Sequence, residues 1–329
     1  MSNEFITDVD ELIRILGLSG SVRSDVNYGL GYPLLVPRDF VNLMENGNPC
    51  DPLLMQVLPR TAESNIIAGF TNNPLDEKIN DEKINTGLPI LKKYCGRALL
   101  MLTRQCGIHC RFCFRRHILQ YAAPQHDLQL PTETELGADI VASLDLIMSD
   151  KNINEVIISG GDPLVQDDEK IKKVLDYIEK IPHVKRLRIH SRYPVIMPKR
   201  ITERLNSVLK RKKPVYLVLH VNHPNELSEN FLARLKILNA PVLLSQTVLL
   251  RGINDNVEVL SELFEKLADN RVIPYYLHQL DRVTGAAHFE VNIVDGCKIV
   301  TSLRERLSGY AIPRYVQEIA GGNCKKLLL

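Results

Sequence analysis

Residues 97–116 read RALLMLTRQCGIHCRFCFRR, a β-rich run that leads directly into three closely spaced cysteines. Further short β-rich runs follow along the chain, at 155–159, 185–190, 215–221, 242–249 and 272–278. Stretches with a helical spacing of apolar residues separate these runs. The alternation predicts repeated βα units and a parallel sheet, either an open doubly wound sheet or a partial barrel.

Length and composition agree with such a fold and exclude other classes of protein. The chain has 329 residues, a formal net charge of +2 and 45% hydrophobic residues, as in an ordinary globular protein. We expect no membrane contact, because no apolar run reaches the roughly 18 residues of a membrane span. We also expect no nucleic-acid binding, because the charge is balanced. The acidic N-terminus lacks a signal-peptide core, which favours a cytoplasmic protein with reduced cysteines.

Polar residues recur where the predicted strands end. Ligands of parallel α/β sheets bind at the C-terminal ends of the strands. The residues at these positions are Cys106–Cys113, Gly160–Asp162, Ser191, Arg192, His220, His223, Gln246 and Asp281. Their repeated placement predicts one shared active site.

The three cysteines, Cys106, Cys110 and Cys113, have a spacing suited to a metal cluster. Thiolates are soft ligands for iron–sulfur clusters and zinc, and structural zinc normally takes four ligands. Three cysteines without a fourth favour a [4Fe-4S] cluster with one open iron. A zinc site completed by a nearby histidine, or chance clustering, is the alternative. Residues 83–126 contain no Asp or Glu but eight Lys or Arg, which suits an anionic cluster.

The longer pattern resembles the lysine 2,3-aminomutase family of radical S-adenosylmethionine enzymes. The resemblance begins with the CxxxCxxC spacing and with Phe112 before the last cysteine. It continues in SGGDPL at 159–164, RIHSRYPV at 188–195, SQTVLLRGIND at 245–255, YYLHQLD at 275–281, AAHF at 286–289 and EIAGGNCK at 318–325. It covers roughly residues 35–325 and is closest to the short branch that makes β-lysine for elongation factor P.

The resemblance implies a fold and a division of the chain. The expected fold is α/β, a partial (βα)6 TIM-type barrel of parallel strands over residues 91–312. An N-terminal helical extension would occupy residues 1–90, and a short C-terminal cofactor-binding tail would occupy residues 313–329. Within the extension, a tandem repeat at 76–85 (DEKINDEKIN) reads as a surface loop without function.

The resemblance also implies binding of S-adenosylmethionine at the open iron. Gly160, Gly161 and Asp162 match the family's Gly-Gly-acid element, and Gln246 matches a glutamine near the coenzyme. Glycines let a backbone approach a ligand closely. Taken alone, the Gly-Gly-Asp-Pro segment would be an ordinary turn, and Gln246 would carry no meaning.

A second implied cofactor is pyridoxal 5′-phosphate, held covalently by Lys325. Composition alone would make Lys325 a solvated residue of the tail. Arg115 matches the family's clamp on the substrate carboxylate, a task suited to a planar fork of donors. Asp281 and Glu318 match the carboxylates that hold the ε-ammonium group of lysine, although the family mostly has Asp at the second place.

The expected activity is radical migration of an amino group that converts L-α-lysine to β-lysine. The expected partners are free L-lysine, a flavodoxin- or ferredoxin-type electron donor and the elongation factor P modification pathway. The sequence leaves open whether the protein forms a homo-oligomer. We expect no zinc, because Asn256 stands where longer family members carry a cysteine ligand. The alternatives are a 2,3-aminomutase of another amino acid, such as arginine, and a zinc-stabilised binding protein without catalysis.

Overall fold

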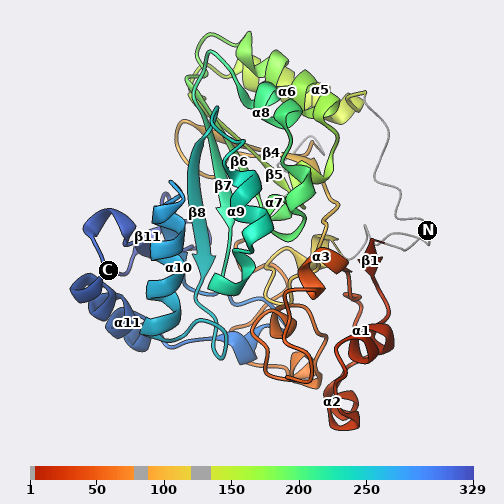
Figure 1. Cartoon of the computed structure of the whole chain (residues 1–329). Coiled ribbons are helices and arrows are strands. Elements are labelled where there is room, and N and C mark those ends of the chain that lie inside the picture. The colour runs from red at the N-terminus through yellow and green to blue at the C-terminus, as the bar shows by residue number, and fades with distance from the viewer. Residues whose placement is uncertain (1–3, 78–87, 120–134) are drawn as a thin grey trace.

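A computed structural model describes residues 4–77, 88–119 and 135–329 of the chain (Figure 1). Its centre is a sheet in the order β11-β10-β9-β8-β7-β6-β5-β4-β3. The strands that correspond to the predicted runs are β4 (Arg97–Thr103), β5 (Glu155–Gly160), β6 (Arg186–Ser191), β7 (Val215–His220), β8 (Val242–Val248) and β9 (Ile273–His278). Each of these strands pairs in parallel with the next one along the chain.

Three further strands extend the sheet beyond the predicted runs. β10 (Arg314–Gln317) pairs in parallel with β9. The sheet is bordered by two antiparallel edge strands, β3 (Ile90–Leu91) on β4 and β11 (Lys326–Leu327) on β10. The predicted C-terminal tail is therefore built into the sheet, and this places its residues beside β9.

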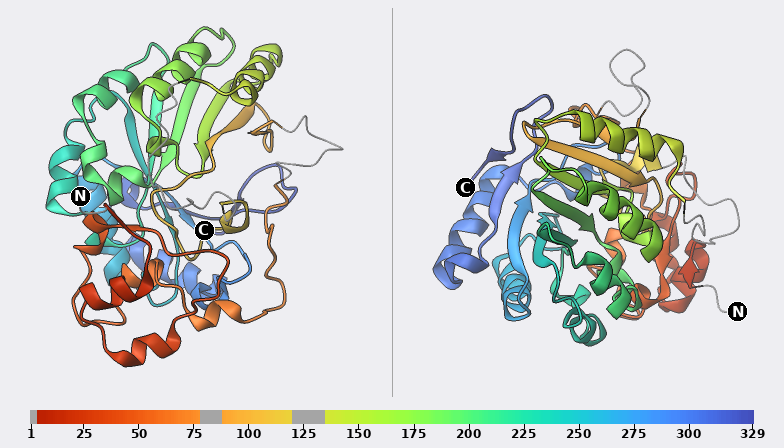
Figure 2. Two further views of the ribbon diagram at one scale, coloured as in Figure 1. Left: turned by 90° about the vertical axis from the view of Figure 1, so that its right-hand side faces the viewer. Right: turned by 90° about the horizontal axis from the view of Figure 1, so that it is seen from above.

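Helices follow the strands and lie along the outer face of the sheet (Figure 2). They are α5 (Ala138–Ser149), α6 (Asp168–Glu179), α7 (Tyr193–Ile196), α8 (Glu203–Leu209), α9 (Glu229–Leu235), α10 (Val257–Asp269) and α11 (Ile293–Arg306). The short helix α4 (Arg116–Leu119) instead follows the cysteine loop. Side chains of Asp167, Thr202, Ser228 and Asn256 cap the first turns of α6, α8, α9 and α10. The apolar stripes of these helices pack on the strands and form the main core.

The N-terminal segment is less helical than the sequence suggests. It contains the short helices α1 (Val9–Ile15), α2 (Gly20–Asp25) and α3 (Arg38–Val41). It also contains a small antiparallel sheet of β1 (Phe5–Ile6) and β2 (Val36–Pro37), which the alternation pattern did not indicate.

The structure confirms the α/β class and the largely parallel sheet. The six-unit partial barrel remains a prediction in its details, and the parallel run contains one strand more than predicted because β10 joins it. No helix in the described parts of the chain has the length and apolar character needed to cross a membrane. Most of the DEKIN repeat lies outside the described residues.

The N-terminal segment holds the cysteine loop that follows β4. Glu63 accepts hydrogen bonds from Arg111 Nε and Nη2, at 2.9 and 2.8 Å, and from Arg116 Nη2 at 2.6 Å. The backbone N–H of Arg111 donates to the carbonyl of Gln56, and that of His109 donates to the carbonyl of Leu35, each at 2.9 Å. The three charged side chains are buried, so this small network fastens the loop to the rest of the molecule.

We expect Glu63→Ala to destabilise the protein strongly. The substitution leaves two buried guanidinium groups without their carboxylate, and a broken buried ion pair costs about 3–5 kcal/mol. The free energy of unfolding, measured by urea denaturation, should fall by that amount. Glu262→Ala is the matched control, because it breaks only an exposed pair with Lys266 and should cost about 0.5 kcal/mol or less. Equal losses in both variants would contradict this account of the loop.

Candidate active site

A single cavity of about 1240 Å³ lies at the C-terminal ends of the central strands. It is larger than most pockets that hold one small ligand, which span roughly 300–1,000 Å³. Its lining includes every predicted site residue, which are Cys106, Cys110, Cys113, Arg115, Gly160, Gly161, Asp162, Gln246, Asp281, Glu318 and Lys325. The fold therefore brings the cysteine loop and the chain's C-terminal lysine to one space.

The three cysteine thiols face this cavity from the loop after β4. The Sγ atom of Cys110 accepts a hydrogen bond from Arg192 Nη1 at 2.8 Å. Burial raises the pKa of the Cys113 thiol to about 12 and that of Cys106 well above its usual value. Thiolates in this place therefore need a cationic partner such as an iron centre.

The three cysteines line one cavity, as the cysteine ligands of an iron–sulfur cluster do. Among the described residues, no three His, Cys, Asp or Glu side chains converge as ligands of one metal ion. In an iron–sulfur cubane each cysteine binds its own iron, so the thiols need to share a cavity but need not meet at a point.

Gly160 and Gly161 serve the packing between β5 and the cysteine loop. Gly160 has φ +131°, and a Cβ there would lie 2.2 Å from the carbonyl oxygen of Thr103. A Cβ at Gly161 would lie 2.2 Å from the carbonyl oxygen of Gln105. The Gly161 N–H donates to Thr103 at 2.7 Å. Close backbone packing thus requires glycine at both positions, which the sequence did not reveal. Contact of these glycines with a coenzyme remains a prediction.

Asp162 is fully engaged with the chain itself. Its carboxylate accepts hydrogen bonds from Ser191 Oγ at 2.6 Å and from the N–H groups of Arg192 and Tyr193 at 2.7 and 2.9 Å. It also caps Leu164 at 3.1 Å. Burial raises the pKa of Asp162, and these hydrogen bonds oppose that rise. The side chain therefore joins the ends of β5 and β6.

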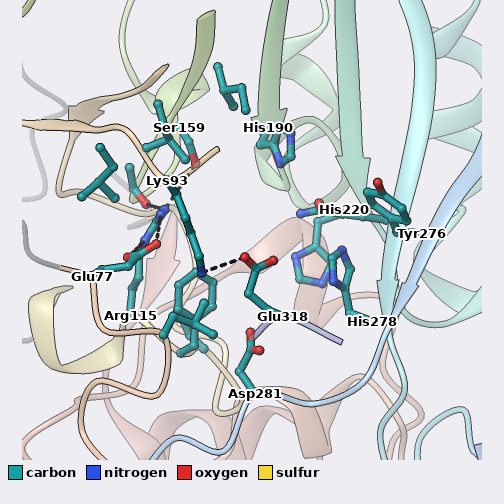
Figure 3. Close-up of a pocket in the computed structure, with 18 of the residues that line it drawn as sticks. Glu77, Lys93, Arg115, Ser159, His190, His220, Tyr276, His278, Asp281 and Glu318 are labelled. Atoms are coloured by element: carbon teal, nitrogen blue, oxygen red, sulfur yellow. Dashed lines mark hydrogen bonds and ion pairs between the residues drawn. The ribbon is translucent and has the colours of Figure 1, made fainter. Parts of the chain in front are cut away.

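Arg115 forms an ion pair with a carboxylate of the chain itself. Glu77 accepts two hydrogen bonds, from Arg115 Nε and Nη2, each at 2.8 Å. The Nη1 atom donates to the carbonyl of Gly160 at 3.1 Å. Both charged side chains are about nine-tenths buried. This side-by-side pairing is the geometry in which arginine binds a carboxylate (Figure 3). Glu77 is the second residue of the DEKIN repeat, a segment that the sequence analysis did not link to the site.

At the other side of the cavity, the Glu318 carboxylate interacts with three hydrogen-bond donors. Directly after β10, its carboxylate pairs with Lys93 at 2.7 Å (Figure 3) and also accepts hydrogen bonds from Tyr94 and Lys325. Burial alone would raise the pKa of Glu318, but Lys325 and the other donors lower it to about 2. Lys325 precedes the edge strand β11, and its amine is thus held inside the cavity, not in solvent.

Asp281 is the second carboxylate in this part of the cavity (Figure 3). Burial raises its pKa to about 7, because Lys325 and Lys93 offset the loss of hydration only in part. The two carboxylates therefore differ, with Glu318 ionised and Asp281 near its titration point at neutral pH. Such a divergence is common where acids have separate tasks.

Three histidines complete the wall: His190 on β6, His220 at the end of β7 and His278 on β9 (Figure 3). Burial lowers the pKa of His220 and His278 to about 3 and that of His190 well below its usual value. All three are therefore neutral. In the part of the chain that the structure describes, the buried Nε2 of His190 has no hydrogen-bond partner. His190 and His278 lie in the motifs at 188–195 and 275–281, but the sequence analysis assigned them no role.

Comparison with known proteins identifies the family of the chain. The family of 4Fe-4S single cluster domains matches residues 95–202. The L-lysine 2,3-aminomutase of Escherichia coli (strain K12) is 40% identical over 324 residues, 97% of this chain and 90% of that protein. The L-lysine 2,3-aminomutase of Haemophilus influenzae is 39% identical over 90% of this chain and 84% of its own length. The one of Clostridium subterminale is 37% identical, over 87% of this chain and 66% of its own length.

The raised pKa of Asp281 predicts a pH-dependent stability. Between about pH 4 and 7 the folded protein keeps a proton on Asp281 that the unfolded chain has lost. Folding is therefore favoured at low pH by this group, and the contribution disappears as pH rises through 7. Relative to Asp281→Asn, the wild type should lose on the order of 2–3 kcal/mol of unfolding free energy between pH 5 and 8.

Urea denaturation at the two pH values measures this difference directly. Asp295→Asn is the control, because Asp295 is exposed beside Lys298. A constant difference between the wild type and Asp281→Asn would show that Asp281 is not held near neutrality.

Proposed function

This chain belongs to the lysine 2,3-aminomutase family of radical S-adenosylmethionine isomerases, and from that premise we propose that it uses pyridoxal 5′-phosphate to convert L-α-lysine to β-lysine. The observation that carries the proposal is the shared cavity. The thiols of a 4Fe-4S domain and a C-terminal lysine line the same space, although more than 200 residues separate them in the chain.

The cluster side of the cavity would hold the radical source. Cys106, Cys110 and Cys113 would each bind one iron, and the remaining iron would bind S-adenosylmethionine beside Gly160 and Gln246. When bound, this pair of groups supplies a carbon-centred radical after one-electron reduction of the sulfonium. The residues of the chain fix the position of the thiols.

The opposite side would hold pyridoxal 5′-phosphate. Lys325 is an amine nucleophile suited to an aldehyde, and a cationic surface of Lys93, Arg97, Arg188 and Arg314 suits a phosphate group. When bound, this cofactor supplies an unsaturated C=N unit through which an amino group can migrate. Glu318 keeps the Lys325 amine within reach of the site in the ligand-free protein.

The substrate would span the space between Arg115 and the two carboxylates. Arg115 would bind its α-carboxylate, and Asp281 with Glu318 would face its ε-ammonium group. Two carboxylates disfavour a substrate with an acidic end, and an ammonium ion entering beside Asp281 favours its ionised form. Because Glu77 pairs with Arg115, a substrate carboxylate that binds Arg115 would have to displace Glu77.

The expected surroundings follow from the proposed reaction. A flavodoxin- or ferredoxin-type protein would deliver the electron in the cytoplasm, and β-lysine would pass to the modification of elongation factor P. A homo-oligomer remains open, and no zinc is needed. The second candidate substrate is arginine, because its side chain also ends in a cation that Asp281 and Glu318 could bind.

We expect separate losses on removing the two halves of the site. The reconstituted wild type should be brown and form β-lysine from L-lysine, S-adenosylmethionine, pyridoxal 5′-phosphate and a reductant. Lys325→Ala should stay brown but lose activity by at least about a hundredfold, an effect typical of an essential group. Cys113→Ala should lose both colour and activity.

Product analysis with lysine and arginine in parallel identifies the substrate, and Lys326→Ala serves as the control for Lys325. Full activity of Lys325→Ala would refute the role of the second cofactor. A colourless, zinc-containing wild type would instead support the non-catalytic binding protein.

We expect Glu77→Gln to improve substrate binding. A neutral amide competes less well for Arg115 than a carboxylate does, so the KM for lysine should fall about tenfold, equal to about 1.4 kcal/mol. Steady-state kinetics measure the change, with Glu262→Gln on the surface of α10 as the control. A higher KM would show that Glu77 aligns Arg115 for the substrate and does not compete with it.

A further inference from the structure

Arg192 reaches from the end of β6 to a cluster cysteine. Its Nη1 atom donates to Cys110 Sγ at 2.8 Å, and its side chain is 5% exposed. The Nε atom is also buried and has no hydrogen-bond partner among the described residues. The guanidinium group thus has one donor on the sulfur and another unused at the edge of the cavity that it lines.

The guanidinium group is held in place from several sides. Its Nη2 atom donates to Gln56 Oε1 at 2.6 Å and to Glu226 Oε2 at 3.1 Å. The rings of Phe40 and Phe112 lie 5.5 and 5.7 Å from it. The backbone N–H of Arg192 is fixed separately by Asp162. These contacts fix the orientation of the guanidinium group, so that the Nη1 N–H points at the Cys110 sulfur.

A cation that donates to a cluster sulfur has a defined electronic effect. Reduction adds one electron to the cluster and breaks no bond, so negative charge on the sulfur atoms increases. Charge-assisted hydrogen bonds are stronger than neutral ones, and hydrogen bonds to the sulfurs and burial set the potential of such clusters. The reduced cluster gains more from the donor than the oxidised cluster does.

We propose that Arg192 is a positioning residue that fixes the Cys110 sulfur and raises the reduction potential of the cluster. Glu226 and Gln56 hold the guanidinium group at the distance this requires. The inference rests on the cluster assigned in the proposed function, and it is independent of which amino acid is the substrate.

The test is a redox titration of the reconstituted full-length protein with dithionite, followed by the electron paramagnetic resonance of the reduced cluster. In Arg192→Gln the equilibrium constant for one-electron reduction should fall about tenfold, which is about 59 mV for one electron. Arg192→Lys, which keeps the charge, should recover part of this shift. Arg200→Gln is the matched control, because Arg200 pairs with Asp168 outside the cavity and should leave the potential unchanged.

The iron content of each variant shows whether a changed reduction potential reflects the loss of Arg192 or the loss of the cluster. If Arg192→Gln binds a full complement of iron with the wild-type potential, the proposal is overturned. If Arg192→Gln fails to fold, Arg192→Gln combined with Glu226→Gln, which leaves no unpaired buried charge, decides the matter by the same measurement. A wild type without a reducible cluster would overturn the cluster assignment itself.

Discussion

The buried pairing of Glu63 with Arg111 and Arg116 is the constraint on which the site depends. The cysteine loop has little regular structure of its own, so its geometry must come from its surroundings. The N-terminal segment supplies it, through one carboxylate and the backbone carbonyls of Leu35 and Gln56. The same segment reaches Arg192 through the Gln56 side chain. A segment that looks like an appendage in the sequence is thus part of the active-site wall.

Electrostatics divides the cavity into two regions with different needs. Around the cysteines, burial disfavours thiolates, and the Arg192 guanidinium offsets part of that cost. Around Lys325, a carboxylate that is firmly ionised stands near one that titrates close to neutrality. Between them, neutral histidines add no charge. A zwitterionic amino acid with a second ammonium group matches this distribution of charge.

Two cationic groups of the proposed site are paired with carboxylates of the chain itself. Arg115 binds Glu77, and Lys325 binds Glu318, so these two groups of the proposed site already have partners. Unpaired buried charges are costly, and internal partners remove that cost in the absence of ligand. A ligand that binds Arg115 and Lys325 would replace Glu77 and Glu318 as their partners. This exchange would lower the affinity of the site but favour ligands that can replace both carboxylates.

The sequence by itself determined the α/β class, the strand positions, the cysteine triplet and the family resemblance, because strand periodicity and motif spacing are local properties of the chain. It could not indicate that β10 and β11 extend the sheet, because such short strands have no periodicity to detect. It also missed Glu77, Lys93 and the contact of Arg192 with Cys110. Only the tertiary structure decided these, because they depend on side chains that meet across strand ends far apart in sequence. The placement of Lys325 in the cavity is of the same kind, since sheet pairing rather than local preference carries the C-terminus there.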